Sequence, residues 1–159
     1  MEPRLSASAQ RVQAALEVLG LSLKVLEMPD TTRTAQEAAT AIGCEVAQIA
    51  KSILFRGAHT GKPILVVASG INRVNEKRIA EMTGEPLEKP KADFVRSATG
   101  YVIGGVPPMG FQTPIETWID EALLLYKEVW AAAGTPNAVF CVDPQVLPRL
   151  TGGKVIRVL

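Results

Sequence analysis

Apolar positions in the first part of the chain follow the period of an amphipathic helix. The apolar stripe within residues 12–19 predicts a helix that is capped by Ser6 or Ser8 and ends at Gly20. A second helix is predicted after Thr34, because Glu37 three residues later completes a capping box. Gly43 is predicted to end that helix. Later helices are expected over residues 75–83, 91–96 and 143–151, the first of them capped by Asn75, ended by Gly84 and packed inward through Ile79 and Met82.

Short apolar runs bounded by turn residues predict the strands. Residues 64–68 are apolar on both faces, and residues 51–56 precede them across a polar, glycine-containing turn. This pair predicts an antiparallel hairpin at the centre of a sheet. Other strands are expected over residues 23–28, 101–103, 113–119, 129–132, 138–142 and 155–159. Strands with interspersed short helices and no linker predict one α+β domain over residues 1–159.

Composition narrows the classes of protein that fit this pattern. The chain has 159 residues and a formal net charge of +1, so binding to nucleic acid would need a local basic patch. Two cysteines and one histidine have no metal-ligand spacing, and we expect neither a metal nor another cofactor. No signal peptide or membrane-length apolar run is seen, which predicts a cytoplasmic protein with no membrane partner.

A glycine- and proline-rich loop is the first candidate for chemistry. Residues 104–110 read Gly-Gly-Val-Pro-Pro-Met-Gly and follow the strand expected over 101–103. Glycine lets another molecule approach the main chain, and bare amides at Gly104 and Gly105 could bind a carbonyl oxygen or an oxyanion. A tight turn that joins two core elements would explain the same residues.

Lys51 is the second candidate. Strand alternation places Lys51 on the same face as Ile53 and Phe55, which draws it toward the core. A lysine in such a place needs an anion, a carboxylate or a substrate oxygen as its partner. Alternatively, it extends from the end of the strand into water.

Two groups of basic residues could contact phosphates. Arg73, Lys77 and Arg78 lie around the start of the third predicted helix, where they would bind a phosphate backbone or form a solvated face. Lys89 and Lys91 precede the glycine loop and would hold a long anionic substrate near it. Cys44 and Cys141 are expected to be small buried hydrophobic residues, since no histidine is placed to activate them.

These motifs together resemble one family. The stretch Ala50–Phe55, followed by Gly100–Gly110, and the helix start Thr34–Ala39 resemble the YbaK / prolyl-tRNA synthetase-associated editing domain. The resemblance implies a single α+β domain with a mixed, barrel-like β-sheet surrounded by helices. It also implies trans-editing, which is hydrolysis of the ester of a misacylated tRNA, typically proline tRNA carrying a small non-cognate amino acid. The implied partners are aminoacyl-tRNA and prolyl-tRNA synthetase.

The resemblance also implies roles for single residues. Lys51 matches the lysine of the family, and Gly104, Gly105 and Pro108 match the loop that binds the aminoacyl carbonyl. Further substrate-binding residues are expected at Gly110, Thr34 and Asn137, the last of these standing in a segment where several members carry a histidine as well. A non-catalytic adaptor that binds tRNA or a synthetase is the alternative, and a small-ligand module is a third.

Overall fold

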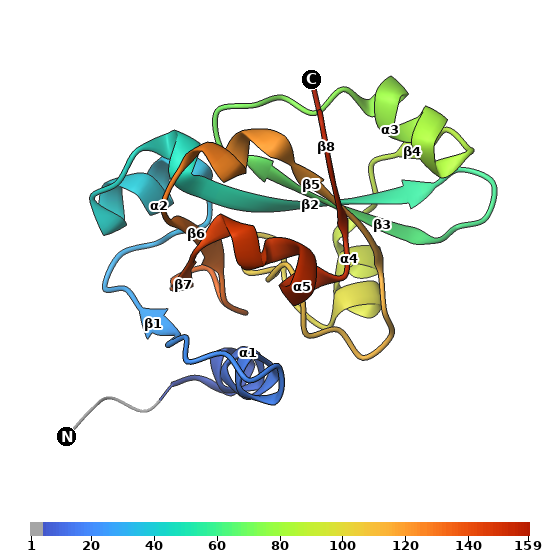
Figure 1. Ribbon diagram of the computed structural model, residues 1–159. Coiled ribbons are helices and arrows are strands. Elements are labelled where there is room, and N and C mark those ends of the chain that lie inside the picture. The colour runs from blue at the N-terminus through green and yellow to red at the C-terminus, as the bar shows by residue number, and fades with distance from the viewer. Residues whose placement is uncertain (1–4) are drawn as a thin grey trace.

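The centre of the molecule is a mixed sheet of eight strands (Figure 1). The computed structural model describes residues 5–159. The strand order is β1-β7-β6-β2-β3-β5-β8, and β4 pairs with β2 outside this path. The strands are β1 (Leu26–Glu27), β2 (Ile49–Gly57), β3 (Pro63–Ser69), β4 (Leu87–Glu88), β5 (Glu116–Asp120), β6 (Val129–Ala132), β7 (Ala138–Val142) and β8 (Lys154–Ile156). The predicted α+β class with a mixed sheet is confirmed.

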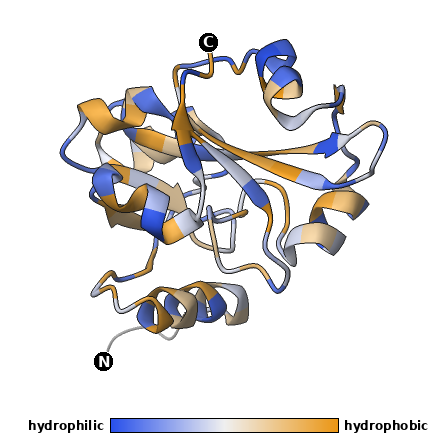
Figure 2. Ribbon diagram, turned by 45° about the vertical axis from the view of Figure 1, so that its right-hand side comes forward, coloured by the Kyte–Doolittle hydropathy of each residue, from blue (hydrophilic) through white to orange (hydrophobic). Residues whose placement is uncertain are grey.

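The predicted central hairpin is confirmed. β2 and β3 pair antiparallel from Ala50 opposite Ser69 to Arg56 opposite Pro63. On its other side β3 pairs parallel with β5, and β2 pairs parallel with β6 over only two residues. The interior residues of β3, from Ile64 to Ala68, are fully buried because helices cover both faces. Figure 2 shows the central strands as largely hydrophobic along their middle.

Helices cover the two faces of the sheet with separate apolar clusters. Residues of α1, α4 and α5 pack on one face, where the largest cluster includes Leu16, Val95 and Leu147. On the other face α3 contributes Ile79, and α2 contributes Ala38 and Ala39 to a smaller cluster (Figure 1). The α-helices are α1 (Ala7–Val18), α2 (Ala35–Ile42), α3 (Glu76–Thr83), α4 (Ala92–Thr99) and α5 (Leu147–Thr151). Short 3₁₀ helices cover Val46–Gln48, Glu121–Leu125 and Pro144–Val146.

The predicted helix caps at Ser6, Thr34 and Asn75 are confirmed. Each side chain accepts a hydrogen bond from the backbone amide three residues later, which satisfies one otherwise unpaired amide. Gly43 and Gly84 end their helices with positive φ, as predicted. None of the helices in the described part of the chain has both the length and the apolar character needed to cross a membrane.

Several predictions about local structure are wrong. Cys44 and Cys141 are half-buried and not buried. The strand expected over residues 23–28 is only Leu26–Glu27, and the helix expected over 91–96 runs on to Thr99.

Residues 101–103 form no strand, because α4 ends at Gly100 and the chain then enters a turn closed by a hydrogen bond from Gly105 N to Val102 O. Val102 and Ile103 are therefore exposed although both are apolar. Met82, expected to face the core, is also exposed, since Ile79 alone fills the inner face of α3.

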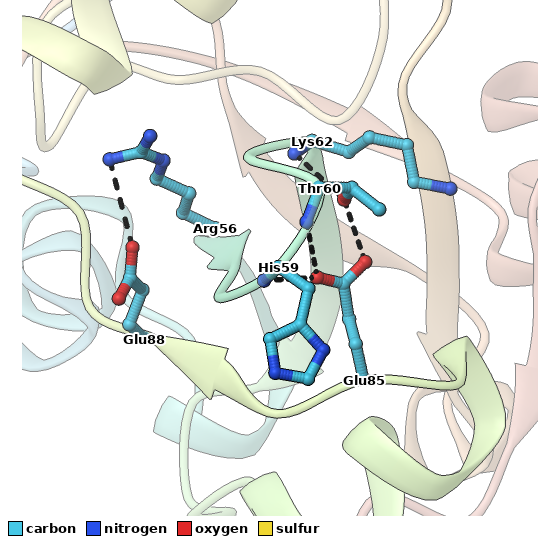
Figure 3. Close-up of polar contacts among 6 residues, drawn as sticks. All are labelled: Arg56, His59, Thr60, Lys62, Glu85 and Glu88. Atoms are coloured by element: carbon cyan, nitrogen blue, oxygen red, sulfur yellow. Dashed lines mark hydrogen bonds and ion pairs between the residues drawn. The ribbon is translucent and has the colours of Figure 1, made fainter.

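A buried carboxylate holds the turn between β2 and β3. Glu85 accepts hydrogen bonds from His59 N at 2.8 Å, Thr60 N at 2.9 Å and Thr60 Oγ1 at 2.6 Å (Figure 3). The hydroxyl and amide of Thr60, with a smaller effect of His59, lower the pKa of Glu85 to about 2. Beside it, an exposed ion pair joins Arg56 to Glu88 of β4 at 3.7 Å. These contacts fix the far end of the hairpin, so that the rest of β2 is held in place.

Candidate active site

A cavity of about 180 Å³ lies between α2, the adjoining parts of β2 and β6, and the loop around Gly104. Lys51 of β2 and Gly104 both line it, so the strand lysine and the glycine loop, 53 positions apart in the sequence, meet at one place. The remaining walls are mainly apolar. Ala35, Ala38 and Ile42 come from α2, Ile49 from β2, and Trp130 and Ala132 from β6.

Lys51 is half-buried on the face of β2 that α2 covers. Burial lowers its pKa, and the charge of Asp120 opposes that effect. The strand pairing explains the second influence, since Lys51 lies opposite Ala68 and the β3–β5 register continues from Ala68 to Asp120. Asp120 is itself buried and accepts hydrogen bonds from Ser69 N at 3.0 Å and Asn72 Nδ2 at 2.9 Å. The cavity thus holds a cation that is partly removed from water and is free to attract a substrate anion or oxygen.

The N-terminus of α2 forms one rim of the cavity. Thr34 caps the helix through Glu37 N at 3.1 Å and also lines the cavity. Thr32 N donates to Pro136 O at 2.6 Å, which ties this rim to the turn between β6 and β7. Between these two threonines, Arg33 is exposed and lines the cavity. The rim therefore carries a second cation close to Lys51.

The glycine loop forms the opposite rim, and its two glycines have different surroundings. Gly104 has a φ of +89°, and a Cβ there would lie 2.5 Å from Arg33 Cγ. Within the described residues, the Gly104 amide has no hydrogen-bond partner. The Gly105 amide instead donates to Val102 O at 3.0 Å, so the expectation of two bare amides is wrong for Gly105.

Gly105 has a packing role that the sequence did not indicate. A Cβ at this position would lie 2.8–2.9 Å from the backbone of Thr135. Gly134 N also donates to Gly105 O at 2.8 Å. Only glycine permits this approach of two backbones, which holds the loop against the turn between β6 and β7.

Several predicted substrate-binding residues do not line this cavity. Pro108 is buried within its loop, and Gly110 lines a different hollow, beside Arg11 and Tyr101. Asn137 is used structurally, because its Nδ2 donates to Met28 O at 3.0 Å and its Oδ1 accepts from Thr135 Oγ1 at 2.9 Å.

The two predicted basic groups lie in different places. Lys89 lines a second cavity next to Gly104, while Lys91 caps α4 nearby and is exposed. Arg73 precedes α3, and Lys77 and Arg78 lie within it, but none of them lines either cavity. Contact of either group with tRNA stays a prediction.

Sequence reasoning missed Arg33, Ser52 and Trp130 as residues of the cavity wall. Arg33 stands directly before the helix cap Thr34, which is the one sequence signal that could have placed it at a helix N-terminus. Trp130 reaches the cavity through the pairing of β6 with β2 at Ile49, and Ser52 lies just beyond the end of that pairing. No short sequence pattern predicts where this pairing begins and ends.

The described residues that line the cavity include a cation and a glycine whose amide is unpaired, but no pair of nucleophile and base. Burial raises the pKa of Cys141 to about 12, and Glu128, which accepts a hydrogen bond from the thiol, adds to the shift. Burial also raises the pKa of Cys44. Within residues 5–159 no three His, Cys, Asp or Glu side chains are grouped so that they could hold a metal ion. The arrangement suits reactions in which water or a substrate group attacks a carbonyl whose oxygen is stabilised by the protein.

Fold and site together define a small α+β protein with a cavity of about 180 Å³ that is lined by a lysine and a glycine. The family model of the aminoacyl-tRNA editing domain matches residues 29–150, and the chain belongs to this family. The matched region contains β2, α2 and the glycine loop, hence every residue that lines the cavity.

Relatives in sequence agree with this membership. The chain is 31% identical over 131 residues to the uncharacterized protein YwhH of Bacillus subtilis, covering 82% of this chain and 83% of that protein. It is 26% identical over 122 residues to a protein of Enterococcus faecalis named putative Cys-tRNA(Pro)/Cys-tRNA(Cys) deacylase EbsC, covering 76% of this chain and 74% of the other.

Solved structures show the same fold. The crystal structure of a putative trans-editing enzyme for prolyl tRNA synthetase is 49% identical, covers 98% of both chains and superposes with a TM-score of 0.91. The hypothetical protein APE2540 is 32% identical, with a TM-score of 0.86 over 93% of this chain and 98% of that one.

Proposed function

We propose that this protein is a trans-editing aminoacyl-tRNA deacylase of the cytoplasm, which hydrolyses the ester of proline tRNA carrying a small non-cognate amino acid. The observation that carries the proposal is the meeting of Lys51 and Gly104 in one cavity. Membership in the editing-domain family supports the reaction class. The trans-editing and deacylase names of two similar proteins support the choice of tRNA.

In the proposed reaction, water attacks the ester carbonyl and the bond between the carbonyl carbon and the ribose oxygen breaks. The amino acid is released as a free carboxylic acid, and the ribose oxygen of the tRNA leaves as a hydroxyl with a proton from the attacking water. The Gly104 amide donates to the oxyanion that forms, and one such donor commonly contributes about 10²–10³ in rate. Lys51 holds the 3′-terminal phosphate or the carbonyl region by its charge. Since no side-chain base lines the cavity, a ribose hydroxyl of the substrate assists the attacking water.

The walls of the cavity favour a small amino acid. Its volume is about 180 Å³, and Ala35, Ala38 and Trp130 present apolar surface to the bound residue. A large side chain would overlap with α2, whose alanines pack closely on the sheet. A small side chain fits without moving the helix.

A deacylation panel tests this function. Proline tRNA charged in turn with alanine, serine, cysteine, 2-aminobutyrate and proline is offered to the full chain, and loss of the ester is followed. We expect hydrolysis of at least one small non-cognate ester and little hydrolysis of the proline ester. Lys51→Ala should lower the rate at least about 10²-fold, since it removes the cation that positions the substrate.

The same panel separates the enzyme from an adaptor. A protein that retains tRNA on a column yet leaves every ester intact would be a non-catalytic tRNA- or synthetase-binding adaptor. Full activity in the Lys51→Ala variant would instead reject the role given to that lysine while leaving the deacylase in place.

A further inference from the structure

A second cavity of about 390 Å³ lies beside the glycine loop, next to the candidate active site. It is bounded by β2, the segment around Lys89 and Pro90, Val95 of α4, and the glycine loop. Four residues line both this cavity and the candidate active site, namely Ser52, Ile103, Gly104 and Val106. The two spaces are therefore neighbours with a shared wall, and the proposed function uses only the first.

The floor of this second cavity contains an unpaired stretch of strand edge. β6 pairs with β2 only as far as Ala50, and β4 pairs with β2 only from Arg56. Continuing the β4 ladder would set Leu54 opposite Pro90, which has no amide hydrogen to donate. Between these points, residues 51–55 have β3 as a neighbour on one side alone.

The register of β2 against β3 shows which backbone groups of residues 51–55 face the unpaired edge. Gly57 N donates to Lys62 O, so the odd-numbered residues of β2 direct their amides and carbonyls toward β3. Ser52 and Leu54 direct their amides and carbonyls to the unpaired edge. Among the described residues, no hydrogen bond to either backbone group is found on that edge.

Two side chains complete a polar pattern at this edge. Ser52 Oγ is buried and has no hydrogen-bond partner within the described residues, although Ser52 lies in the wall of both cavities. Lys89 adds a positive charge at the same cavity and is exposed. The rest of the lining is apolar, from Ile53, Leu54, Pro90, Val95, Ile103 and Val106.

The geometry points to a binding site for the 3′-terminal adenosine of the tRNA substrate in this second cavity. The Ser52 carbonyl and the Leu54 amide form an acceptor–donor pair along one strand edge, which matches the amino group and the ring nitrogen N1 of adenine. Apolar walls suit the faces of the base, and Lys89 suits its 5′-phosphate, which leaves Lys51 to the carbonyl region, the second of the two roles proposed for it. The ester on the ribose would then pass Gly104 into the first cavity. This inference rests on the proposed function for its choice of substrate.

Adenosine 5′-monophosphate tests the site without any hydrolysis. Titrated into the ¹⁵N-labelled full chain, it should shift the amides of Ser52, Leu54 and Ile103 in a saturable manner. Inosine 5′-monophosphate presents an oxygen in place of the amino group and a protonated N1, so it should bind at least about 10-fold more weakly. Lys89→Ala should weaken binding of adenosine monophosphate severalfold, whereas Lys127→Ala, an exposed lysine outside both cavities, should not.

Competition with tRNA distinguishes the end of a tRNA from a free nucleotide. Uncharged tRNA should displace adenosine monophosphate, and tRNA trimmed of its terminal adenosine should do so at least about 10-fold less well. Equal affinity for the two nucleotides, shifts centred on Ala35, Ala38 and Trp130, or equal displacement by trimmed tRNA would each overturn the inference. These readouts are independent of catalysis, so a protein that binds adenosine monophosphate in this way but cleaves no ester would reject the proposed function alone.

Discussion

At the scale of single residues, Gly105 supports the position of Gly104 without lining the cavity itself. Gly105→Ala would force a Cβ to within 2.8–2.9 Å of the Thr135 backbone. We expect a loss of about 1–3 kcal/mol in the free energy of unfolding, because backbone must move on one side or the other. The same shift should lower deacylation, since it displaces the Gly104 amide.

Gly43→Ala is the matched control for that change. Gly43 has a φ of +84° but open space around its Cα, so alanine there meets only the cost of a left-handed backbone, about 1 kcal/mol. Urea unfolding and deacylation rates of both variants make the comparison. If Gly105→Ala behaves like Gly43→Ala in both assays, the packing role of Gly105 is wrong.

We expect the buried charge of Lys51 to lower the stability of the fold while serving the reaction. Burial lowers its pKa, which means that the folded state disfavours the charged form. Lys51→Met, which keeps the length of the side chain without its charge, should therefore raise Tm at pH 7 and abolish deacylation. The gain should shrink as pH rises toward the ordinary lysine pKa of 10.5, because the wild-type lysine is then neutral in the folded protein. A Tm that falls at pH 7 would show that attraction to Asp120 outweighs desolvation.

At the scale of elements, the turn between β2 and β3 depends on the carboxylate of Glu85. Its folded pKa of about 2 lies below the ordinary value of 4.5, so the ionised form stabilises the fold above pH 4.5. This contribution is lost as pH falls from 4.5 toward 2. Glu85→Ala should lower Tm at pH 7 and flatten the dependence of Tm on pH in that window. Thermal unfolding of the wild type and of Glu85→Ala between pH 2 and 7 measures this contribution. If the two curves of Tm against pH run parallel, the ionised Glu85 does not stabilise the turn.

The elements also show which parts of the fold a sequence can predict. Caps such as Thr34 and stops such as Gly84 act within four residues, and helix ends were predicted from them correctly. The apolar run at 101–103 was misread because the turn at Gly105 depends on contact with Thr135, which is distant in sequence. The gap in pairing along β2 likewise depends on where β6 and β4 begin and end, which no local pattern of residues specifies.

At the scale of the whole molecule, the fold brings together residues that carry the candidate chemistry from separate elements. Lys51 comes from the central hairpin, Arg33 from the start of α2 and Gly104 from the loop after α4. The lysine and the glycine loop could be proposed as a pair from the sequence through a family resemblance. Arg33 could not, because its proximity to Gly104 arises only when α2 packs across the sheet.

The distribution of charge gives a test at this scale. A net charge of +1 provides little general attraction to tRNA, so affinity has to come from local basic residues. Lys89 lines the second cavity and Lys91 follows two residues later, whereas Arg73 and Lys77 belong to the region of α3 and line neither cavity. Lys89→Ala/Lys91→Ala should weaken tRNA binding more than Arg73→Ala/Lys77→Ala.

The salt dependence of binding shows whether those lysines bind phosphates. Removing one phosphate-binding lysine should reduce the slope of log affinity against log salt by about 0.7–0.9, so the slope for the Lys89→Ala/Lys91→Ala variant should fall by about 1.5. Filter binding of uncharged proline tRNA across a range of potassium chloride concentrations measures the slope. If the slope falls more in Arg73→Ala/Lys77→Ala than in Lys89→Ala/Lys91→Ala, the tRNA lies across α3 instead. The acceptor end would then have to approach the cavity over that helix, and Lys89 would face solvent in the complex.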